Sequence, residues 1–285
     1  MTIDPKSAAE AASPADTAAQ PLMAGKRGLI MGVANDHSIA WGIAKALAAQ
    51  GAELAFTYQA DSFARRVAPL AESVGSDLLL SCDVVSDDSI DAAFAGLSKR
   101  WDKLDFVVHA IAYSDKSELK GRYLDTTREN FRRTLDISCF SFTNVAKRAA
   151  PLMTDGGSLV TLSYLGAERV TPNYNVMGVA KAALEASVRY LAVDLGDQNV
   201  RVNAISAGPM RTLAGSAISD ARYVYRFTQT NAPLRRNVTL DEIGGAGLYL
   251  LSDLSSGVTG EVLYVDSGFN VTAIPHPNRQ QAEEE

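Results

Sequence analysis

Residues 27–42 read Arg-Gly-Leu-Ile-Met-Gly-Val-Ala-Asn-Asp-His-Ser-Ile-Ala-Trp-Gly, and this stretch sets the expectation for the fold. The apolar run Arg27–Val33 predicts a strand, and Ser38–Gln50 predicts a helix directly after it. Gly32 and Gly42 bracket the turn between them, and Ser38 stands where it can cap the helix and offer a hydroxyl. Small residues at such a turn let the backbone approach a pyrophosphate, whose charge a helix N-terminus favours. The stretch predicts a nucleotide-binding turn, with an ordinary strand–helix loop as the alternative.

The same alternation of strand and helix continues along the chain. Further strands are predicted at 52–58, 77–82, 104–112, 158–162, 200–205 and 262–265. Helices are predicted at 61–74, 86–101 and 175–195, helical periodicity runs from Phe131 to Ala149, and a Thr239–Glu242 capping box precedes a helix over 243–251. Strands separated by helices imply right-handed crossovers. The expected fold class is therefore α/β, a Rossmann-like doubly wound parallel sheet of about seven strands with helices on both faces.

Length and composition predict one folded domain with polar ends. The chain has 285 residues, of which 47% are hydrophobic and 21% charged, and these fractions are typical of a globular protein. We expect a single domain over residues 22–275, a disordered leader over 1–21 rich in Ala, Ser and acidic groups, and a flexible polar tail over 276–285.

Charge and residue counts exclude several classes of partner. The net charge is −6 and Lys/Arg runs are no longer than two, which argues against nucleic acid as a partner. The sequence has neither an apolar run of about 18 residues nor a signal peptide, so neither a membrane span nor secretion is expected. Three histidines form no metal-ligand pattern. The two cysteines, Cys82 and Cys139, are expected to be free thiols in the reducing cytoplasm.

Polar residues follow the predicted strands where a ligand of a doubly wound sheet would lie. Such a ligand binds over the carboxyl ends of the strands, at the switch in strand order. The second strand ends at Gln59, the third is followed by Asp83, and the fourth ends in His109–Ala112. Asp83 is suited to an adenine amino group. Each residue alone could be a simple strand cap, but together they favour a nucleotide cleft.

Tyr174 and Lys181 form a candidate catalytic pair. They lie seven residues apart on the predicted helix, nearly two turns, so they share a face. Lysine is long and leans towards the helix N-terminus, so its ammonium can approach the phenol. A nearby cation would lower the pKa of the phenol from its ordinary value of about 10 and suit it to proton donation. A surface Tyr and Lys at this spacing by chance is the alternative.

Two further segments adjoin the predicted cleft. Tyr164 follows the fifth strand and can close over a substrate or hydrogen-bond its carbonyl. Gly208-Pro209 ends the sixth strand, and Thr212 can offer a hydroxyl to a cofactor. Residues 214–227, small at first and then aromatic, are expected to form either a mobile lid over the substrate or a surface helix.

The motifs taken together resemble the short-chain dehydrogenase/reductase superfamily. They are more closely similar to bacterial NADH-dependent enoyl-acyl-carrier-protein reductases of fatty-acid elongation. The resemblance runs from about Leu22 to Asn270 and is carried by GVANDHSIAWGIA (32–44), FTYQ (56–59), SYLGAERVTPNYNVMGVAKAALEA (163–186) and RVNAISAGPMRTLA (201–214).

Departures from the wider superfamily point to the enoyl reductase branch. Most members place the lysine four residues after the tyrosine, where this chain has Gly178. The usual Asn-Asn-Ala-Gly is His109–Ala112 here, Tyr164 occupies the usual catalytic serine region, and Asp136 stands for the relay asparagine. A ketone reductase needs that relay to resupply a proton to an alkoxide, whereas an enoyl reductase forms an enolate.

The resemblance implies a mechanism and a set of site residues. NADH delivers hydride to Cβ of a trans-2-enoyl thioester, and Tyr174 hydrogen-bonds or protonates the enolate. Lys181 holds the nicotinamide ribose hydroxyls, Tyr164 lines the acyl pocket and Ser114 lies near substrate; no metal is implied. With the glycine turn included, the residues expected to bind cofactor are Gly32, Ser38, Ile39, Gln59, Asp83, Val84, Ile111, Lys181, Met210, Arg211, Thr212, Leu213 and Ala214.

Partners and alternatives follow from the same resemblance. It implies an acyl carrier protein bearing the enoyl chain, and a homotetramer. NADPH stays open as the cofactor, because the acidic residue expected about 20 positions after the first glycine is missing and Arg65 and Arg66 lie beyond Gln59. A ketoreductase of the same superfamily and a catalytically silent nucleotide-sensing or scaffold protein are the alternative functions.

Overall fold

The described residues, 20–213 and 220–274 of a computed structural model, form one parallel sheet of seven strands. The order is β3-β2-β1-β4-β5-β6-β7, and every neighbouring pair is parallel. The strands are β1 (Arg27–Met31), β2 (Glu53–Tyr58), β3 (Leu78–Ser81), β4 (Phe106–His109), β5 (Gly157–Ser163), β6 (Val200–Ala207) and β7 (Val262–Val265). The predicted doubly wound α/β fold is confirmed. The predicted leader and tail lie almost wholly outside the described residues.

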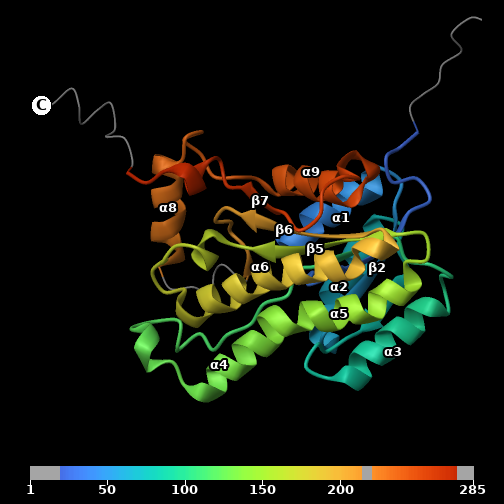
Figure 1. The fold of residues 1–285 in the computed structure, drawn as a ribbon, viewed down its shortest axis with the longest axis horizontal. Coiled ribbons are helices and arrows are strands. Elements are labelled where there is room, and N and C mark those ends of the chain that lie inside the picture. The colour runs from blue at the N-terminus through green and yellow to red at the C-terminus, as the bar shows by residue number, and fades with distance from the viewer. Residues whose placement is uncertain (1–19, 214–219, 275–285) are drawn as a thin grey trace, which may run out of the picture.

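Helices cover both faces of the sheet. They are α1 (Ile39–Ala49), α2 (Asp61–Ser73), α3 (Asp87–Ser98), α4 (Arg128–Leu135), α5 (Ser141–Ala149), α6 (Asn175–Leu195), α8 (Ala221–Asn231) and α9 (Leu240–Leu251). Figure 1 shows α1 and α9 on one side of the sheet and α5 and α6 on the other. Among the described helices, none is both long and apolar enough to cross a membrane.

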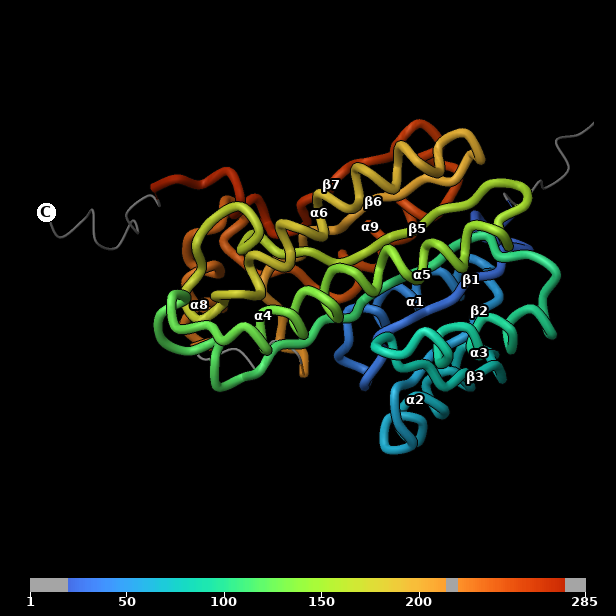
Figure 2. Tube along the Cα trace, turned by 60° about the horizontal axis from the view of Figure 1, so that its bottom comes forward, coloured from blue at the N-terminus to red at the C-terminus, as the bar shows by residue number. Residues whose placement is uncertain are grey.

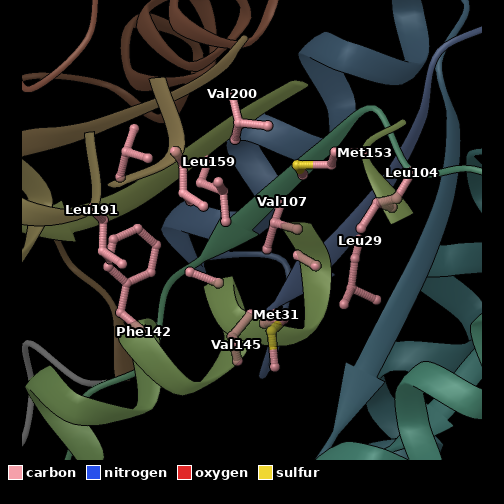
Figure 3. Packing of buried hydrophobic residues seen from close by; sticks show 14 of the residues in the cluster. Leu29, Met31, Leu104, Val107, Phe142, Val145, Met153, Leu159, Leu191 and Val200 are labelled. Carbon is pink, nitrogen blue, oxygen red and sulfur yellow. The ribbon is translucent and has the colours of Figure 1, made fainter. Parts of the chain in front are cut away.

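Alternate residues of each strand enter two separate cores. On β1, Leu29 and Met31 pack towards α3, α5 and α6, whereas Ile30 packs towards α1, α2 and α9. Figure 3 shows the first of these cores, which includes Val107 of β4 and Phe142 of α5. Because successive side chains of a strand point to opposite faces, a sheet covered on both sides has near-continuous apolar strands. This explains the runs from which the strands were predicted.

The strand order reverses direction between β1 and β4, and this places the site. From β1 the chain winds out to β2 and β3, and then returns past β1 to β4. The loops after β1 and β4 therefore diverge to opposite sides and leave a crevice at the carboxyl edge. Figure 2 shows α8 and α4 at the same end of the molecule, beyond the sheet.

Several boundaries differ from prediction for local reasons. The first strand ends at Met31 and not at Val33, because Gly32 adopts φ +98° and leaves the extended region. The fourth strand ends at His109 and not at Ala112. The helical periodicity over 131–149 is not one regular helix: α4 and α5 are joined by a π-helical turn at Asp136–Phe140. Such turns occur often at functional sites.

Candidate active site

A cavity of about 2920 Å³ lies over the carboxyl ends of the strands. Its lining includes every described residue that the sequence assigned to cofactor or substrate: Gly32, Ser38, Ile39, Gln59, Asp83, Val84, Ile111, Ser114, Tyr164, Tyr174, Lys181, Met210, Arg211, Thr212 and Leu213. Ala214 lies outside the described residues. Of the predicted lid, 214–227, the structure describes only the part from Asp220 onward, and α8 begins at the next residue, Ala221. Residues from six of the seven strands or their following loops thus meet in one space.

The turn after β1 fits closely against β4. A Cβ placed on Gly32 would lie 2.1 Å from the carbonyl oxygen of Ala110, so glycine is required there. The Ser38 hydroxyl accepts hydrogen bonds from the amides of Ala34 (2.9 Å) and Asn35 (3.1 Å). The expectation that this hydroxyl caps α1 is wrong: Ser38 is the N-cap residue, but its oxygen is bonded within the loop before it. The N-terminus of α1 therefore faces the cavity without a side-chain cap.

The ends of β2 and β3 meet through Gln59 and Asp83. The Gln59 amide donates to the Asp83 carboxylate at 3.5 Å, and the same carboxylate oxygen accepts from the Val85 amide at 3.2 Å. The Asp83 amide donates to the Ser89 hydroxyl at 2.9 Å, which ties the turn to α3. Asp83 is thus held at the cavity wall beside Val84, as predicted from its place after the strand.

The segment after β4 is attached to the π-helical turn. The Tyr113 amide donates to the Ser138 hydroxyl (2.9 Å), which in turn donates to the Tyr113 carbonyl (3.0 Å). The Ser114 hydroxyl accepts from Thr134 at 2.9 Å. Asp136 and Ile137 consequently line the cavity. Sequence reasoning did not predict this turn, because the apolar residues from Phe131 to Ala149 recur every three or four positions, as they would in one regular helix.

Tyr164 and Tyr174 lie next to each other in the cavity wall. Their rings make an edge-to-face contact, with centroids 5.1 Å apart and planes at 70°. Tyr164 directly follows β5, and Tyr174 directly precedes α6. Burial raises the pKa of both phenols above the ordinary value. Both therefore stay protonated at neutral pH and can donate a hydrogen bond.

Lys181 lies on the same face of α6 and is 6% exposed. Its ammonium donates to the carbonyl of Leu162 at 2.6 Å. Burial lowers the pKa of Lys181 to about 8. The expectation that the ammonium lowers the pKa of the Tyr174 phenol is wrong for this structure, because the cost of burying a phenolate dominates.

Two buried polar residues lie on the strands and the helix that carry the site, and one of them, Glu185, was not predicted from the sequence. Glu185, one turn after Lys181, accepts a hydrogen bond from the Ser163 hydroxyl, and burial raises its pKa. The four-residue spacing from Lys181 was the available signal. His109 lies between the hydroxyls of Ser141 (2.9 Å) and Thr161 (3.2 Å), and burial lowers its pKa to about 3, so the ring is neutral.

The remaining wall comes from the loop after β6. The Thr212 amide donates to the carbonyl of Met210 at 3.0 Å, and the Arg211 guanidinium stacks 4.8 Å above the ring of Tyr225 on α8. Within residues 20–213 and 220–274, His, Cys, Asp and Glu form no group that could hold a metal ion. Both thiols are free, with Cys82 buried and Cys139 partly buried.

Known proteins share this sequence and architecture over nearly their full length. The family described as Enoyl-(Acyl carrier protein) reductase matches residues 32–270. Enoyl-(acyl-carrier-protein) reductase (NADH) 2 of Rhizobium meliloti (strain 1021) is 68% identical over 254 residues, which are 89% of this chain and 95% of that one.

Solved structures of enoyl-(acyl-carrier-protein) reductases have the same fold as this chain. FabI from Candidatus Liberibacter asiaticus has a TM-score of 0.88 at 56% identity, covering 90% of this chain and 99% of that one. The reductase from Anaplasma phagocytophilum, in complex with NAD, has a TM-score of 0.87 at 61% identity, covering 90% and 98%. A cavity built by these tyrosines and this lysine on a doubly wound sheet thus occurs in a chain that belongs to the enoyl-(acyl carrier protein) reductase family.

Proposed function

We propose that the protein reduces the C2=C3 double bond of a trans-2-enoyl thioester with NADH as the hydride donor. The observation that carries this proposal is the meeting of Tyr164, Tyr174 and Lys181 in the cavity that the ends of β1 to β4 also line. A dinucleotide and an acyl thioester need adjoining sites. This one cavity is lined both by the residues assigned to the dinucleotide and by those assigned to the thioester.

The residues present fit a dinucleotide. The turn at Gly32 is closed tightly against Ala110, and the N-terminus of α1, free of a side-chain cap, faces the cavity. A helix N-terminus favours a pyrophosphate, and a carboxylate such as that of Asp83 accepts from an adenine amino group. When bound, NADH supplies the hydride and the two electrons of the reduction.

Tyr174 is the group assigned to the charge that develops on substrate. Hydride addition to Cβ moves negative charge onto the thioester oxygen as an enolate. A phenol whose pKa burial has raised remains protonated, so Tyr174 donates a hydrogen bond or a proton to that oxygen. In a site that excludes water, a donor already in place stabilises such charge strongly.

Lys181 and Tyr164 complete the arrangement. The Lys181 ammonium has three hydrogens, of which one is directed to Leu162, so further donors remain for the ribose hydroxyls of the cofactor. Its positive charge also favours the enolate. Tyr164 packs edge-on against Tyr174 and, with Ser114, borders the space assigned to the acyl chain.

The partners and setting belong to the same proposal. The substrate is the enoyl chain carried by an acyl carrier protein. A homotetramer is supported by exposed apolar side chains on α6, Tyr190 and Val193, and light scattering of the purified protein tests it. A cytoplasmic location is supported by two free thiols.

Cofactor oxidation tests the function directly. We expect NADH, monitored by its absorbance, to be oxidised with crotonyl and longer enoyl thioesters, NADPH to be oxidised more slowly, and 3-oxoacyl thioesters to leave NADH unchanged. Turnover of a 3-oxoacyl substrate at the enoyl rate would instead identify a ketoreductase. No turnover of either substrate would identify a nucleotide-binding protein without this activity.

A further inference from the structure

Tyr174 stands between two asparagines with left-handed backbones. Asn173 has φ 58° and Asn175 has φ 38°, whereas Tyr174 itself has φ −104°. Outside glycine, a positive φ carries strain, and asparagine is among the residues that tolerate it best. Strained backbone persists only where the surroundings hold it in place, and it gathers at active sites. Each of these two asparagines has such an anchor.

Asn175 is held by the loop at residues 118–121. Its side-chain amide donates to the carbonyls of Glu118 (3.3 Å), Leu119 (3.2 Å) and Gly121 (3.3 Å). An amide has only two hydrogens, so the three carbonyls share them. The Leu119 side chain is 4% exposed and packs in one cluster with Tyr174. Asn175 thereby connects the start of α6 to the loop that covers the tyrosine.

That loop is itself attached to α4. The Glu118 carboxylate accepts from the Thr127 amide (2.9 Å) and from its hydroxyl (2.8 Å), and Thr127 is the N-cap of α4. The loop that anchors Asn175 is therefore held in place by α4. This attachment allows the loop to keep the backbone of Asn175 in its left-handed conformation.

Asn173 is held by a different part of the chain, Asp220. Its amide donates to the carboxylate of Asp220 at 2.8 Å. Asp220 is the N-cap residue of α8 and also has a left-handed backbone, with φ 60°. The residue before Tyr174 is thus connected to α8, and the residue after it to α4. Both anchors, Asp220 and Leu119, line the cavity.

The ring of Tyr174 has little room to adjust. A Cβ on Gly166 would lie 2.4 Å from Cδ1 of Tyr174, so the ring rests directly on the backbone there. Tyr164 contacts it edge-on. With the ring restricted by both neighbours, the height and direction of the phenol depend on the backbone at 173–175. A displacement of about 1 Å in a reacting group can reduce a rate by about 10²-fold.

We propose that Asn173 and Asn175 are positioning residues for Tyr174, which set the phenol through Asp220 of α8 and through the loop at 118–121. The inference rests on the proposed role of Tyr174. It predicts that loss of either anchor lowers kcat for enoyl reduction while leaving KM for NADH unchanged, because neither asparagine is assigned to the cofactor.

Three substitutions at Asn175 separate the amide from the backbone. Asn175→Gly tolerates φ 38° but lacks the amide, and Asn175→Asp retains the shape but lacks the donor. We expect both to lower kcat by about 10- to 100-fold. Asn175→Ala loses the amide and the tolerance for positive φ, so its kcat is expected to be lower still. Asn199→Ala is the matched control, because Asn199 has φ 57° at the start of β6, outside the cavity lining. Its kcat should equal that of the wild type.

Combination with Tyr174→Phe distinguishes positioning from general damage. Once the phenol is absent, Asn175→Gly should lower kcat no further. Equal losses in both backgrounds would show a structural role and overturn the inference. Full kcat in Asn175→Gly, with Tyr174→Phe impaired, would also overturn it while leaving the proposed function intact. Full activity in Tyr174→Phe would overturn the role of Tyr174 and this inference together.

The second anchor is tested by a cycle of its own. Asn173→Gly and Asp220→Gly should each lower kcat, and the double variant should be no worse than either one, because both remove the same hydrogen bond while glycine tolerates the left-handed backbone at each position. Additive losses would mean that the two residues act separately, and this would contradict the link to α8.

Discussion

The ammonium of Lys181 hydrogen-bonds the carbonyl of Leu162, the next-to-last residue of β5, at 2.6 Å. The neighbouring residue on the strand, Ser163, donates to Glu185, one turn farther along α6. Two successive residues of β5 are therefore connected to two residues on one face of α6. This fixes the register of the helix against the sheet, and with it the position of Tyr174 at the start of that helix.

Replacing Tyr174 with Phe removes the phenol and leaves the ring. We expect Tyr174→Phe to lower kcat for crotonyl thioester by about 10²–10³-fold, because one donor to a developing oxyanion contributes about that much. NADH affinity, measured by calorimetric titration, should change little. Unimpaired turnover would remove Tyr174 from the mechanism and direct attention to Tyr164.

Lys181→Ala should weaken NADH binding and turnover together, because the ammonium is assigned both to the ribose hydroxyls and to the local charge. Lys181→Arg should restore part of both, since a planar guanidinium has a different reach. Calorimetric titration of NADH checks the binding. Unchanged NADH affinity in Lys181→Ala would place the side chain outside the cofactor site.

NADH affinity should fall as the pH rises through about 8. Burial lowers the pKa of Lys181 to about 8, so the free protein holds the ammonium below that pH and loses it above. If NADH binds the ammonium form, binding takes up a proton above about pH 8, and titration in buffers of different ionisation enthalpy measures this uptake. Lys181→Arg is the control, because its guanidinium keeps its charge. The same pH dependence in that variant would exclude Lys181 as its source.

Gly166→Ala should lower kcat, although Gly166 is not one of the residues assigned to the cofactor. The new Cβ would lie 2.4 Å from Cδ1 of Tyr174, so the ring must move. Gly245→Ala is the matched control on an exposed position of α9: among the described residues, and apart from its chain neighbours and the adjoining backbone of its own helix, no heavy atom lies within 4 Å of the place that its new methyl would take. That control should gain about 0.5–1 kcal/mol in helix stability and retain full activity. Wild-type kcat in Gly166→Ala would mean that the ring position is not critical.

Acid should destabilise the protein partly through Glu242. The Arg236 guanidinium and the Thr239 amide hydrogen-bond this carboxylate and hold its pKa at about 2. A carboxyl whose pKa is lower in the folded protein stabilises the fold at pH values above the pKa that it has in the unfolded chain. That contribution is lost as the pH falls from about 4.5 to about 2. Urea unfolding across this range should show a shallower decline in Glu242→Gln than in the wild type. Thr239→Ala should cost about 1 kcal/mol at neutral pH.

Patterns local in sequence predicted the elements well. The helix at Asn175–Leu195, the strand at Val262–Val265 and the capping box at Thr239 agree with the structure. Apolar periodicity records which face of an element is buried, so it identifies elements without reference to their neighbours. The ordered motifs likewise identified the family, and the described residues that they singled out line one cavity in the structure.

The doubly wound fold could be predicted from the residues alone, and so could the edge of the sheet where the cavity lies and the two tyrosines and the lysine that line it. Four features became visible only in the folded protein: the protonation of Tyr174, the direction of the Lys181 ammonium, the π-helical turn at Asp136–Phe140 and the anchors of Asn173 and Asn175. The amide of Asn175 meets a loop 54 to 57 residues away in sequence, and that of Asn173 meets a helix cap 47 residues away. Burial and such long-range hydrogen bonds arise only when distant segments pack, so neither the pKa of a phenol nor a left-handed backbone can be derived from the residues beside it.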